Sequence, residues 1–336
     1  MTHNIPLSPD TAHDVRHRVQ SVAQLRARGV TSAQTAARCL PGGPWQQLLP
    51  GVYLLHSGRP SDEERLRGAL LYAGRPAAAP ARRTVPVQAG HGYGEAMVTG
   101  LAALALYGFA SAPPAIALHR VDVLVPRTRR LRSTRFVQVT RAAVLPRPQR
   151  RLGLPLAPVE RALADAVSAL DDASTVRRLL TEAVRGGHCE PVAVVQELNA
   201  AELLGRAHVT DAVDALLMEG RAVAEGRLYE MVRTHGLPEP LWNVELSLPG
   251  GRLLGGVDAY WPEQAVALEL GVRSPREQHV VFAAEREHLE RLGVTVVRVG
   301  SKQLREAMSQ QAVVVRTAMM AAEDREPAAY VVALPR

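Results

Sequence analysis

The chain has 336 residues, with 40 Lys or Arg against 33 Asp or Glu and a formal net charge of +7. That length allows two or three domains, each with its own hydrophobic core. No apolar run reaches the ~18 residues of a membrane span, and residues 1–30 contain no apolar signal core, so we expect a cytoplasmic protein without membrane contact. Only Cys39 and Cys189 are present, which argues against a disulfide framework or a cysteine zinc site.

The basic charge is concentrated in the first half of the chain. Residues 1–150 hold 20 arginines against 7 acidic residues, whereas residues 151–336 hold 20 basic residues against 26 acidic ones. A GC-rich genome can explain a preference for Arg over Lys, but it does not explain this asymmetry. We therefore expect the first half to bind a polyanion, with double-stranded DNA as the favoured partner.

The first predicted elements are typical of a winged helix-turn-helix. A helix is expected at 21–28, closed by Gly29, and a second at 31–40, ended by a Pro-Gly-Gly-Pro run. Two strands at 45–49 and 52–56 flank a Pro-Gly pair and predict a hairpin.

The second of these helices would read bases in a major groove. Its apolar residues are expected to pack inward: Ala33, Ala36, Ala37 and Leu40. Its polar residues would then face the DNA: Ser32, Gln34, Thr35 and Arg38. Gln can pair with adenine and Arg with guanine, while Gln46, Gln47 and His56 of the hairpin would add contacts. The alternative is a solvated polar face on a module that contacts protein.

A run of five arginines lies between strands expected at 121–125 and 136–139. It consists of Arg127, Arg129, Arg130, Arg132 and Arg135. These guanidinium groups could clamp phosphates, with a strong dependence on salt. The alternatives are a solvated hairpin tip and an acidic or nucleotide-handling protein partner.

Helices are expected at 61–74 and 95–107, and residues 158–235 are almost wholly helical, interrupted at Gly186-Gly187 and Gly205. From Trp242 the pattern changes to strands. These are expected at 242–248, 253–260, 265–270, 294–299 and 330–334, with helices at 283–292 and 302–322.

Two acidic residues occupy adjacent C-terminal strands, Asp258 on the first and Glu269 on the second. Carboxylates so placed can converge on Mg²⁺, which holds a phosphodiester and activates water, and Glu225 on the preceding helix would complete the shell. A nuclease of this kind normally carries Lys or Asp two positions after the second acid, where this chain has Gly271. We therefore favour a catalytically silent site. The structural alternative is that both acids pair with Arg273 or Arg286.

These segments resemble a known family. Residues 24–31 (QLRARGVT) and 45–53 (WQQLLPGVY) are similar to the winged-helix domain of AbiEi, the antitoxin family of type IV toxin–antitoxin systems. Residues 98–108, 123–126 and 154–165 are similar to the domain that follows it. The C-terminal frame resembles the very-short-patch-repair-like branch of PD-(D/E)xK endonucleases, where Asp258, Glu269 and Glu225 match the acids and Gly271 departs from the pattern.

The resemblance implies a DNA-binding regulator that represses its own operon. It is equally compatible with opposition to a nucleotidyltransferase toxin, without a lasting complex, and with an orphan regulator that has no cognate toxin. We expect an α+β protein with four parts: a winged helix-turn-helix at 1–60, an AbiEi-like α/β middle domain at 61–170, a helical connector at 171–221 and a PD-(D/E)xK-like α/β/α domain at 222–336. No cofactor is expected for a regulator. The alternative is a Mg²⁺-dependent DNA endonuclease targeted by the winged helix.

Overall fold

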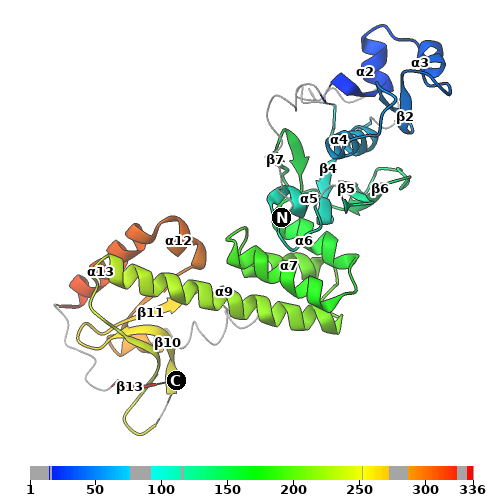
Figure 1. Cartoon of the computed structure of the whole chain (residues 1–336). Coiled ribbons are helices and arrows are strands. Elements are labelled where there is room, and N and C mark those ends of the chain that lie inside the picture. The colour runs from blue at the N-terminus through cyan, green and yellow to red at the C-terminus, as the bar shows by residue number, and fades with distance from the viewer. Residues whose placement is uncertain are drawn as a thin grey trace. The chain divides into compact units, whose positions relative to one another are not determined.

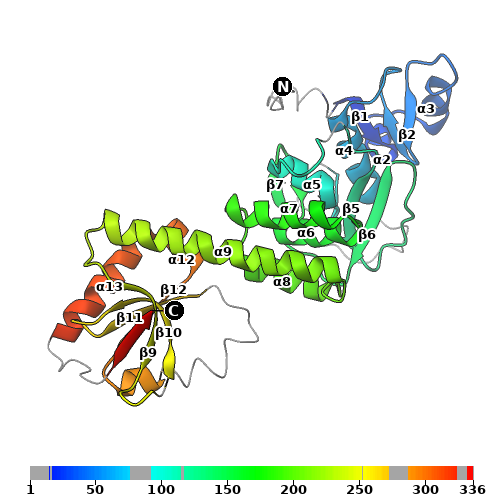
Figure 2. The ribbon, with the colours of Figure 1, turned by 60° about the horizontal axis from the view of Figure 1, so that its bottom comes forward.

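The structure, a computed structural model, describes residues 15, 17–75, 92–114, 117–251, 253–271, 287–323 and 331–335. Within these residues the chain is a mixed α+β protein with three sheets, which confirms the predicted class (Figures 1 and 2). It forms two compact units. Unit 1 comprises Met1–Leu179 with Glu197–Gly205, and unit 2 comprises Leu180–Gln196 with Arg206–Arg336. The finer domain boundaries stay predictions.

A three-stranded sheet and two short helices form the first part of unit 1. The strands β1 (Val19–Ser21), β3 (Val52–Leu54) and β2 (Gln46–Leu49) pair antiparallel in the order β1-β3-β2. Between β1 and β2 the chain forms α2 (Val22–Ala27) and α3 (Ser32–Arg38). Each helix begins with a capping box, in which a Ser or Thr and a Gln three residues later satisfy each other's free backbone N–H groups.

The second sheet of unit 1 has the order β6-β5-β4-β8-β7. Its strands are β4 (Met97–Thr99), β5 (Val121–Pro126), β6 (Val137–Ala142), β7 (Gln149–Arg151) and β8 (Leu154–Leu156). β5 and β6 pair in parallel, so residues 127–136 run back along the sheet and the hairpin-tip interpretation of the arginine run is wrong. The strands β1, β4, β7 and β8 escape prediction because three residues are too few to show an alternating pattern.

Three helices complete the main body of unit 1: α4 (Asp62–Ala73), α5 (Gly100–Tyr107) and α6 (Val159–Ser168). α4 contacts strands of both sheets and is buried over nearly its whole length, including the ion pair of Arg67 with Glu63. α4 therefore connects the sheet that adjoins α2 and α3 with the second sheet.

Further helices follow: α7 (Ala173–Arg185), α8 (Pro191–Ala200) and α9 (Ala207–Thr234). They confirm the predicted helical region, with the interruptions at the glycines that the sequence indicates. Among the described residues, no helix is both long and apolar enough to cross a bilayer.

Unit 2 is built on a five-stranded sheet of order β12-β11-β10-β9-β13. Its strands are β9 (Leu241–Ser247), β10 (Leu253–Trp261), β11 (Val266–Leu270), β12 (Thr295–Val299) and β13 (Val332–Pro335). β11 and β12 are parallel and the other pairs antiparallel.

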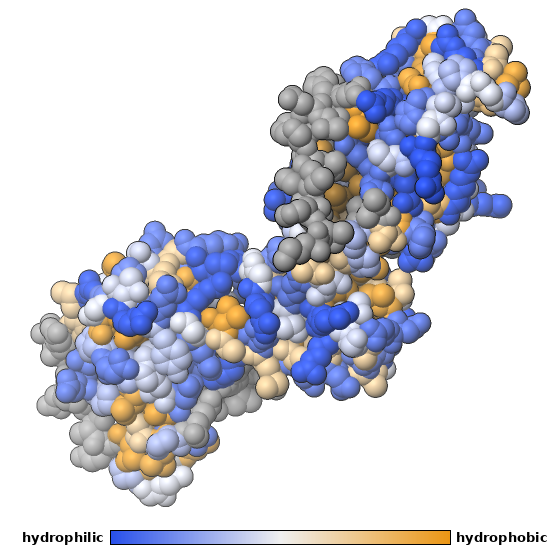
Figure 3. Space-filling model, viewed as in Figure 1, coloured by the Kyte–Doolittle hydropathy of each residue, from blue (hydrophilic) through white to orange (hydrophobic). Residues whose placement is uncertain are grey.

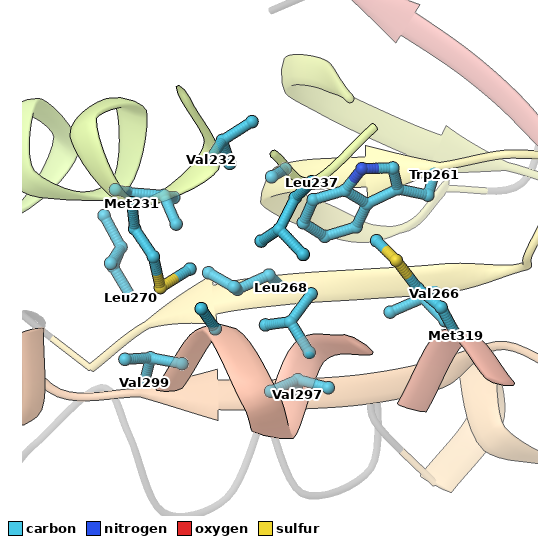
Figure 4. Packing of buried hydrophobic residues seen from close by; sticks show 14 of the residues in the cluster. Met231, Val232, Leu237, Trp261, Val266, Leu268, Leu270, Val297, Val299 and Met319 are labelled. Atoms are coloured by element: carbon cyan, nitrogen blue, oxygen red, sulfur yellow. The ribbon is translucent and has the colours of Figure 1, made fainter. Parts of the chain in front are cut away.

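One face of this sheet packs against helices α9, α12 (Ser301–Glu306) and α13 (Met308–Glu323). Figure 4 shows Trp261, Leu268 and Val297 of the sheet meeting Met231 of α9 and Met319 of α13 in one apolar cluster. This core fixes α9 over the sheet, and α9 carries the predicted acid Glu225. The helix predicted at 283–292 lies outside the described residues up to residue 286.

Candidate nucleic-acid interface and carboxylate site

Helix α3 buries a single side chain, that of Thr35, against the rest of unit 1. Gly29 adopts a φ of 80°, which glycine accepts at low cost, and this turn separates α2 from α3. Thr31 caps α3: its hydroxyl accepts from Gln34 N at 3.2 Å and its own N–H donates to Gln34 Oε1 at 2.9 Å. At the other end, Trp45 N donates to Arg38 O. Between these ends only Thr35 is buried.

The structure contradicts the predicted orientation of α3. Thr35, expected to face DNA, is 5% exposed, and its hydroxyl donates to the carbonyl oxygen of Thr31 at 3.0 Å. That hydrogen bond satisfies the buried hydroxyl, so a threonine can occupy an inward position. The residues expected to pack inward are instead exposed: Ala33, Ala36, Ala37 and Leu40.

The other predicted base readers are exposed but engaged within the protein. Ser32 Oγ accepts from Arg26 Nη2 at 3.3 Å. Gln34 takes part in the capping box. The Arg38 guanidinium lies over the Trp45 ring, 4.4 Å from its centroid. Stacking of this kind leaves the in-plane N–H groups of Arg38 free to donate.

Of the three hairpin residues predicted to contact DNA, two are engaged within the protein and one is exposed. Gln46 Nε2 donates to the carbonyl oxygens of His56 and Gly58, at 3.1 and 2.6 Å, so this side chain braces the end of β3. His56 Nε2 lies 3.0 Å from Glu64 Oε1. Gln47 is exposed.

The arginine run does not present all of its groups to solvent. Arg129 donates to the carbonyl oxygens of Ala73 and Arg75, and Arg135 donates to those of Gln47 and Leu48 at 2.6 Å. These two arginines therefore hold the segment against the end of α4 and against β2. Arg127, Arg130, Arg132 and Arg135 are exposed, and the first three of these make none of the bonds just described.

The charge around α2 and α3 is of one sign. Residues 15–61 contain six arginines and no Asp or Glu. The first acids that follow, on α4, are paired within the protein: Asp62 with Arg65, Glu63 with Arg67 and Glu64 with His56. The exposed arginines Arg26, Arg28 and Arg38 therefore lie on a segment that has no carboxylate of its own. Such a surface attracts polyanions.

In unit 2, one arginine bonds to two of the three predicted acids. Arg221, one helical turn before Glu225 on α9, donates from Nε to Glu225 Oε1 and from Nη2 to Asp258 Oδ1, both at 2.7 Å. Asp258 is 6% exposed, and its Oδ2 accepts from Leu270 N at 2.7 Å. The pairing of β10 with β11 ends at Ala259↔Leu268, and beyond it the Asp258 carboxylate takes the place of a backbone acceptor.

Glu269 occupies the neighbouring position on β11, in register with Arg298 of β12. A Cβ atom added at Gly271 would lie 3.5 Å from Arg298 Nε, so Arg298 borders the corner where a nuclease would carry its third residue. Arg273 and Arg286, the predicted partners of the acids, lie outside the described residues. Arg221 is instead the partner of Asp258.

The carboxylates as placed do not fit Mg²⁺. Both oxygens of Asp258 are engaged by hydrogen-bond donors, and a guanidinium already supplies the positive charge between Asp258 and Glu225. In the part of the chain that is described, no group of three or more His, Cys, Asp or Glu side chains is arranged to hold a metal ion.

Among known proteins, the chain has a distant likeness to a solved structure. No family model and no curated protein matches it. Among solved structures, the Rv2827c protein of Mycobacterium tuberculosis aligns over 62% of this chain and 75% of its own, at 18% identity and a TM-score of 0.38. A likeness this weak supports no conclusion about fold or function.

The sequence pattern also misses a polar cluster in unit 1. Asp165 on α6 accepts from Thr99 Oγ1 at 2.6 Å and from both Nε and Nη2 of Arg161. Asp122 on β5 lies 3.1 Å from Arg120 Nε. Burial raises the pKa of Asp122, while Arg120 lowers it and Asp165 raises it further. Only Arg161 and Asp165, four residues apart on one helix, give a signal that the sequence could have shown.

Proposed function

We propose that the protein is a DNA-binding transcriptional regulator in which residues 17–59 act as a winged helix-turn-helix. The observation that carries the proposal is the exposed α3 within residues 15–61, which contain six arginines and no acid. DNA affinity is dominated by phosphate contacts from such groups, and a helix after a tight glycine turn is the element that enters a major groove. Arg127, Arg130 and Arg132 would add phosphate contacts from the neighbouring sheet.

The biological role we propose is that of an AbiEi-like antitoxin. Its support is the resemblance of residues 24–31 and 45–53 to that family's DNA-binding domain, at the positions that form α2, the turn, β2 and β3. The regulator would repress its own operon and oppose a nucleotidyltransferase toxin. A toxin gene next to the regulator's own would support this role.

For unit 2 we propose a PD-(D/E)xK-like domain that does not cleave DNA. Arg221 supports this proposal, because its guanidinium bonds to both Asp258 and Glu225, and Gly271 supplies no catalytic side chain. The domain would then contribute structure or a binding surface.

DNA binding is tested by fluorescence anisotropy of the full chain with a labelled duplex from upstream of its own gene. We expect an affinity that falls by about 10³-fold or more between ~50 and ~200 mM salt. Arg38→Ala should weaken binding by roughly 1–3 kcal/mol if Arg38 pairs with guanine, or reduce the salt slope by about one if it contacts phosphate. Arg178→Ala, an exposed arginine of α7, is the matched control and should change neither value. Affinity that does not depend on salt would overturn the proposal.

A second function, Mg²⁺-dependent cleavage, would require Mg²⁺ to displace Arg221 from Asp258 and Glu225, and one observation favours it. Arg298 borders the position of Gly271 and could supply the positive charge that the motif lacks there. Supercoiled plasmid incubated with the protein and Mg²⁺ distinguishes the two. Nicking that Asp258→Ala abolishes would establish the endonuclease and refute the silent domain.

A further inference from the structure

The side of α3 that points away from unit 1 is small and apolar. Successive residues of an α-helix are turned by about 100°, so the positions opposite the buried Thr35 are Ala33 and Ala37. Ala36 lies beside them, and Leu40, just beyond the helix, is 62% exposed. We call these four residues the alanine face. Figure 3 shows hydrophobic surface among polar atoms at the end of unit 1 where Figure 1 places α3.

The polar residues of α3 lie to either side of this face and are partly committed. A bidentate pair with adenine needs both the oxygen and the nitrogen of a glutamine amide. In Gln34 the oxygen accepts from Thr31 N, so the pair would compete with the capping box that starts the helix. Arg38 is held at the edge by its stack on Trp45.

The charge around the alanine face identifies its occupant. Arg26 and Arg28 are exposed at the end of α2 and Arg38 at the end of α3, and residues 15–61 offer no carboxylate. Two copies of the chain meeting through this face would bring like charges together, whereas a nucleic acid duplex would bring phosphates to the arginines. Charge complementarity therefore favours DNA over a second copy.

We propose that the alanine face reads thymine by contact with its C5 methyl group in the major groove. The inference rests on the proposed DNA binding and specifies what is recognised. The thymine methyl is the apolar feature of the major-groove edge, and alanine is among the side chains that contact it. Short side chains also let the helix backbone approach the base edges closely, since the groove is only slightly wider than a helix.

The test uses the full chain and a duplex enriched from a random library by binding to it. The duplex is synthesised again with single thymines replaced by deoxyuridine, which removes the methyl and keeps the pairing edge and the charge. We expect affinity to fall about 4-fold for each contacted methyl and about 16-fold for two, as burial of one such group implies.

A double change in the protein links the effect to α3. Ala33→Ser with Ala37→Ser keeps the size of the face but makes it polar. This variant should bind the thymine duplex more weakly and should no longer distinguish thymine from deoxyuridine. Ala222→Ser, at an exposed position of α9, is the control and should keep the distinction. Circular dichroism confirms that the variants retain their helices.

The outcomes separate the two proposals. Equal affinity of the unmodified protein for thymine and deoxyuridine duplexes would overturn the inference and leave DNA binding intact. Failure to enrich or retain any duplex at low salt would overturn the proposed function itself. If the chain dimerises in sedimentation, Leu40→Glu disperses the dimer, and the serine variant binds DNA normally, then the face is an interface with a second copy and the inference is wrong.

Discussion

Arginines meet opposite surroundings in the two units. Around α3, Arg26, Arg28 and Arg38 are exposed on a segment without a carboxylate. On α9, Arg221 is bonded to two carboxylates, one of them buried. Arginine residues thus form an exposed positive surface in unit 1, whereas in unit 2 an arginine occupies the space between two carboxylates. The total charge of a chain says little about either, because the neighbours of each arginine determine what it can bind.

The largest expected effect on stability comes from the hydrophobic core of unit 2, which supports the site of Arg221, Asp258 and Glu225. Trp261 is 1% exposed, and its Nε1 donates to Pro238 O at 2.7 Å. Trp261→Ala should lower the free energy of unfolding of unit 2 by about 4 kcal/mol, because it opens a cavity and leaves that carbonyl unpaired. The urea transition of unit 2 measures this loss.

If unit 1 alone binds DNA, Trp261→Ala should leave the affinity unchanged to within about twofold, as for sites without shared partners. A large loss of affinity at a temperature where unit 1 remains folded would show that unit 2 takes part in binding. The contrast between the exposed arginines of unit 1 and the paired Arg221 of unit 2 would then not explain which unit binds DNA.

A smaller effect is expected at the site where Arg221 bonds to Asp258 and Glu225. Arg221→Met leaves Asp258 buried without its partner, which should cost about 2 kcal/mol, less than for a fully buried pair because the Arg221 side chain is 34% exposed. Millimolar Mn²⁺ should then restore part of the stability, since the freed carboxylates can bind a cation.

Arg185→Met is the matched control, because Arg185 makes a comparable pair with Glu219 at the surface. It should change stability little and show no response to Mn²⁺. If Arg221→Met is also indifferent to Mn²⁺, then Arg221 does not stand in the place of a metal.

Short-range signals in the sequence predict the helices well and their faces poorly. The predicted starts at residues 21 and 31 lie within one residue of the observed starts of α2 and α3, where Ser21 and Thr31 are the capping residues. The alanines of α3 are mildly apolar and fit either orientation, so the sequence could not show that a threonine is the buried residue. Apolar periodicity works only where large side chains define it.

Long-range contacts explain the other differences. The parallel pairing of β5 with β6 depends on the sheet, and ten connecting residues are compatible with a long hairpin loop as well. Arg221 is visible in the sequence as a partner of Glu225 four residues later. Its bond to Asp258 spans 37 residues and requires α9 to lie over β10.

The smallest expected effect concerns Asp122, a carboxylate whose arginine is half exposed. Arg120 compensates the burial of Asp122 only in part, so the folded pKa of Asp122 is raised above its ordinary value near 3.8. The stability contributed by its neutral form is present below that value and is lost as pH rises through the folded pKa. Asp122→Asn should therefore flatten the decline in stability of unit 1 as pH rises from about 4.

Asp172 provides the control for this comparison. It accepts hydrogen bonds from Ser174 and Thr175, which lower its pKa to about 2. Its contribution to stability is lost only as pH falls below about 4, so Asp172→Asn should leave the slope between pH ~4 and ~7 unchanged. The urea unfolding midpoints of unit 1, measured for both variants across this pH range, test the two expectations. An unchanged slope in Asp122→Asn would mean that Arg120, although half exposed, fully offsets the burial of the Asp122 carboxylate.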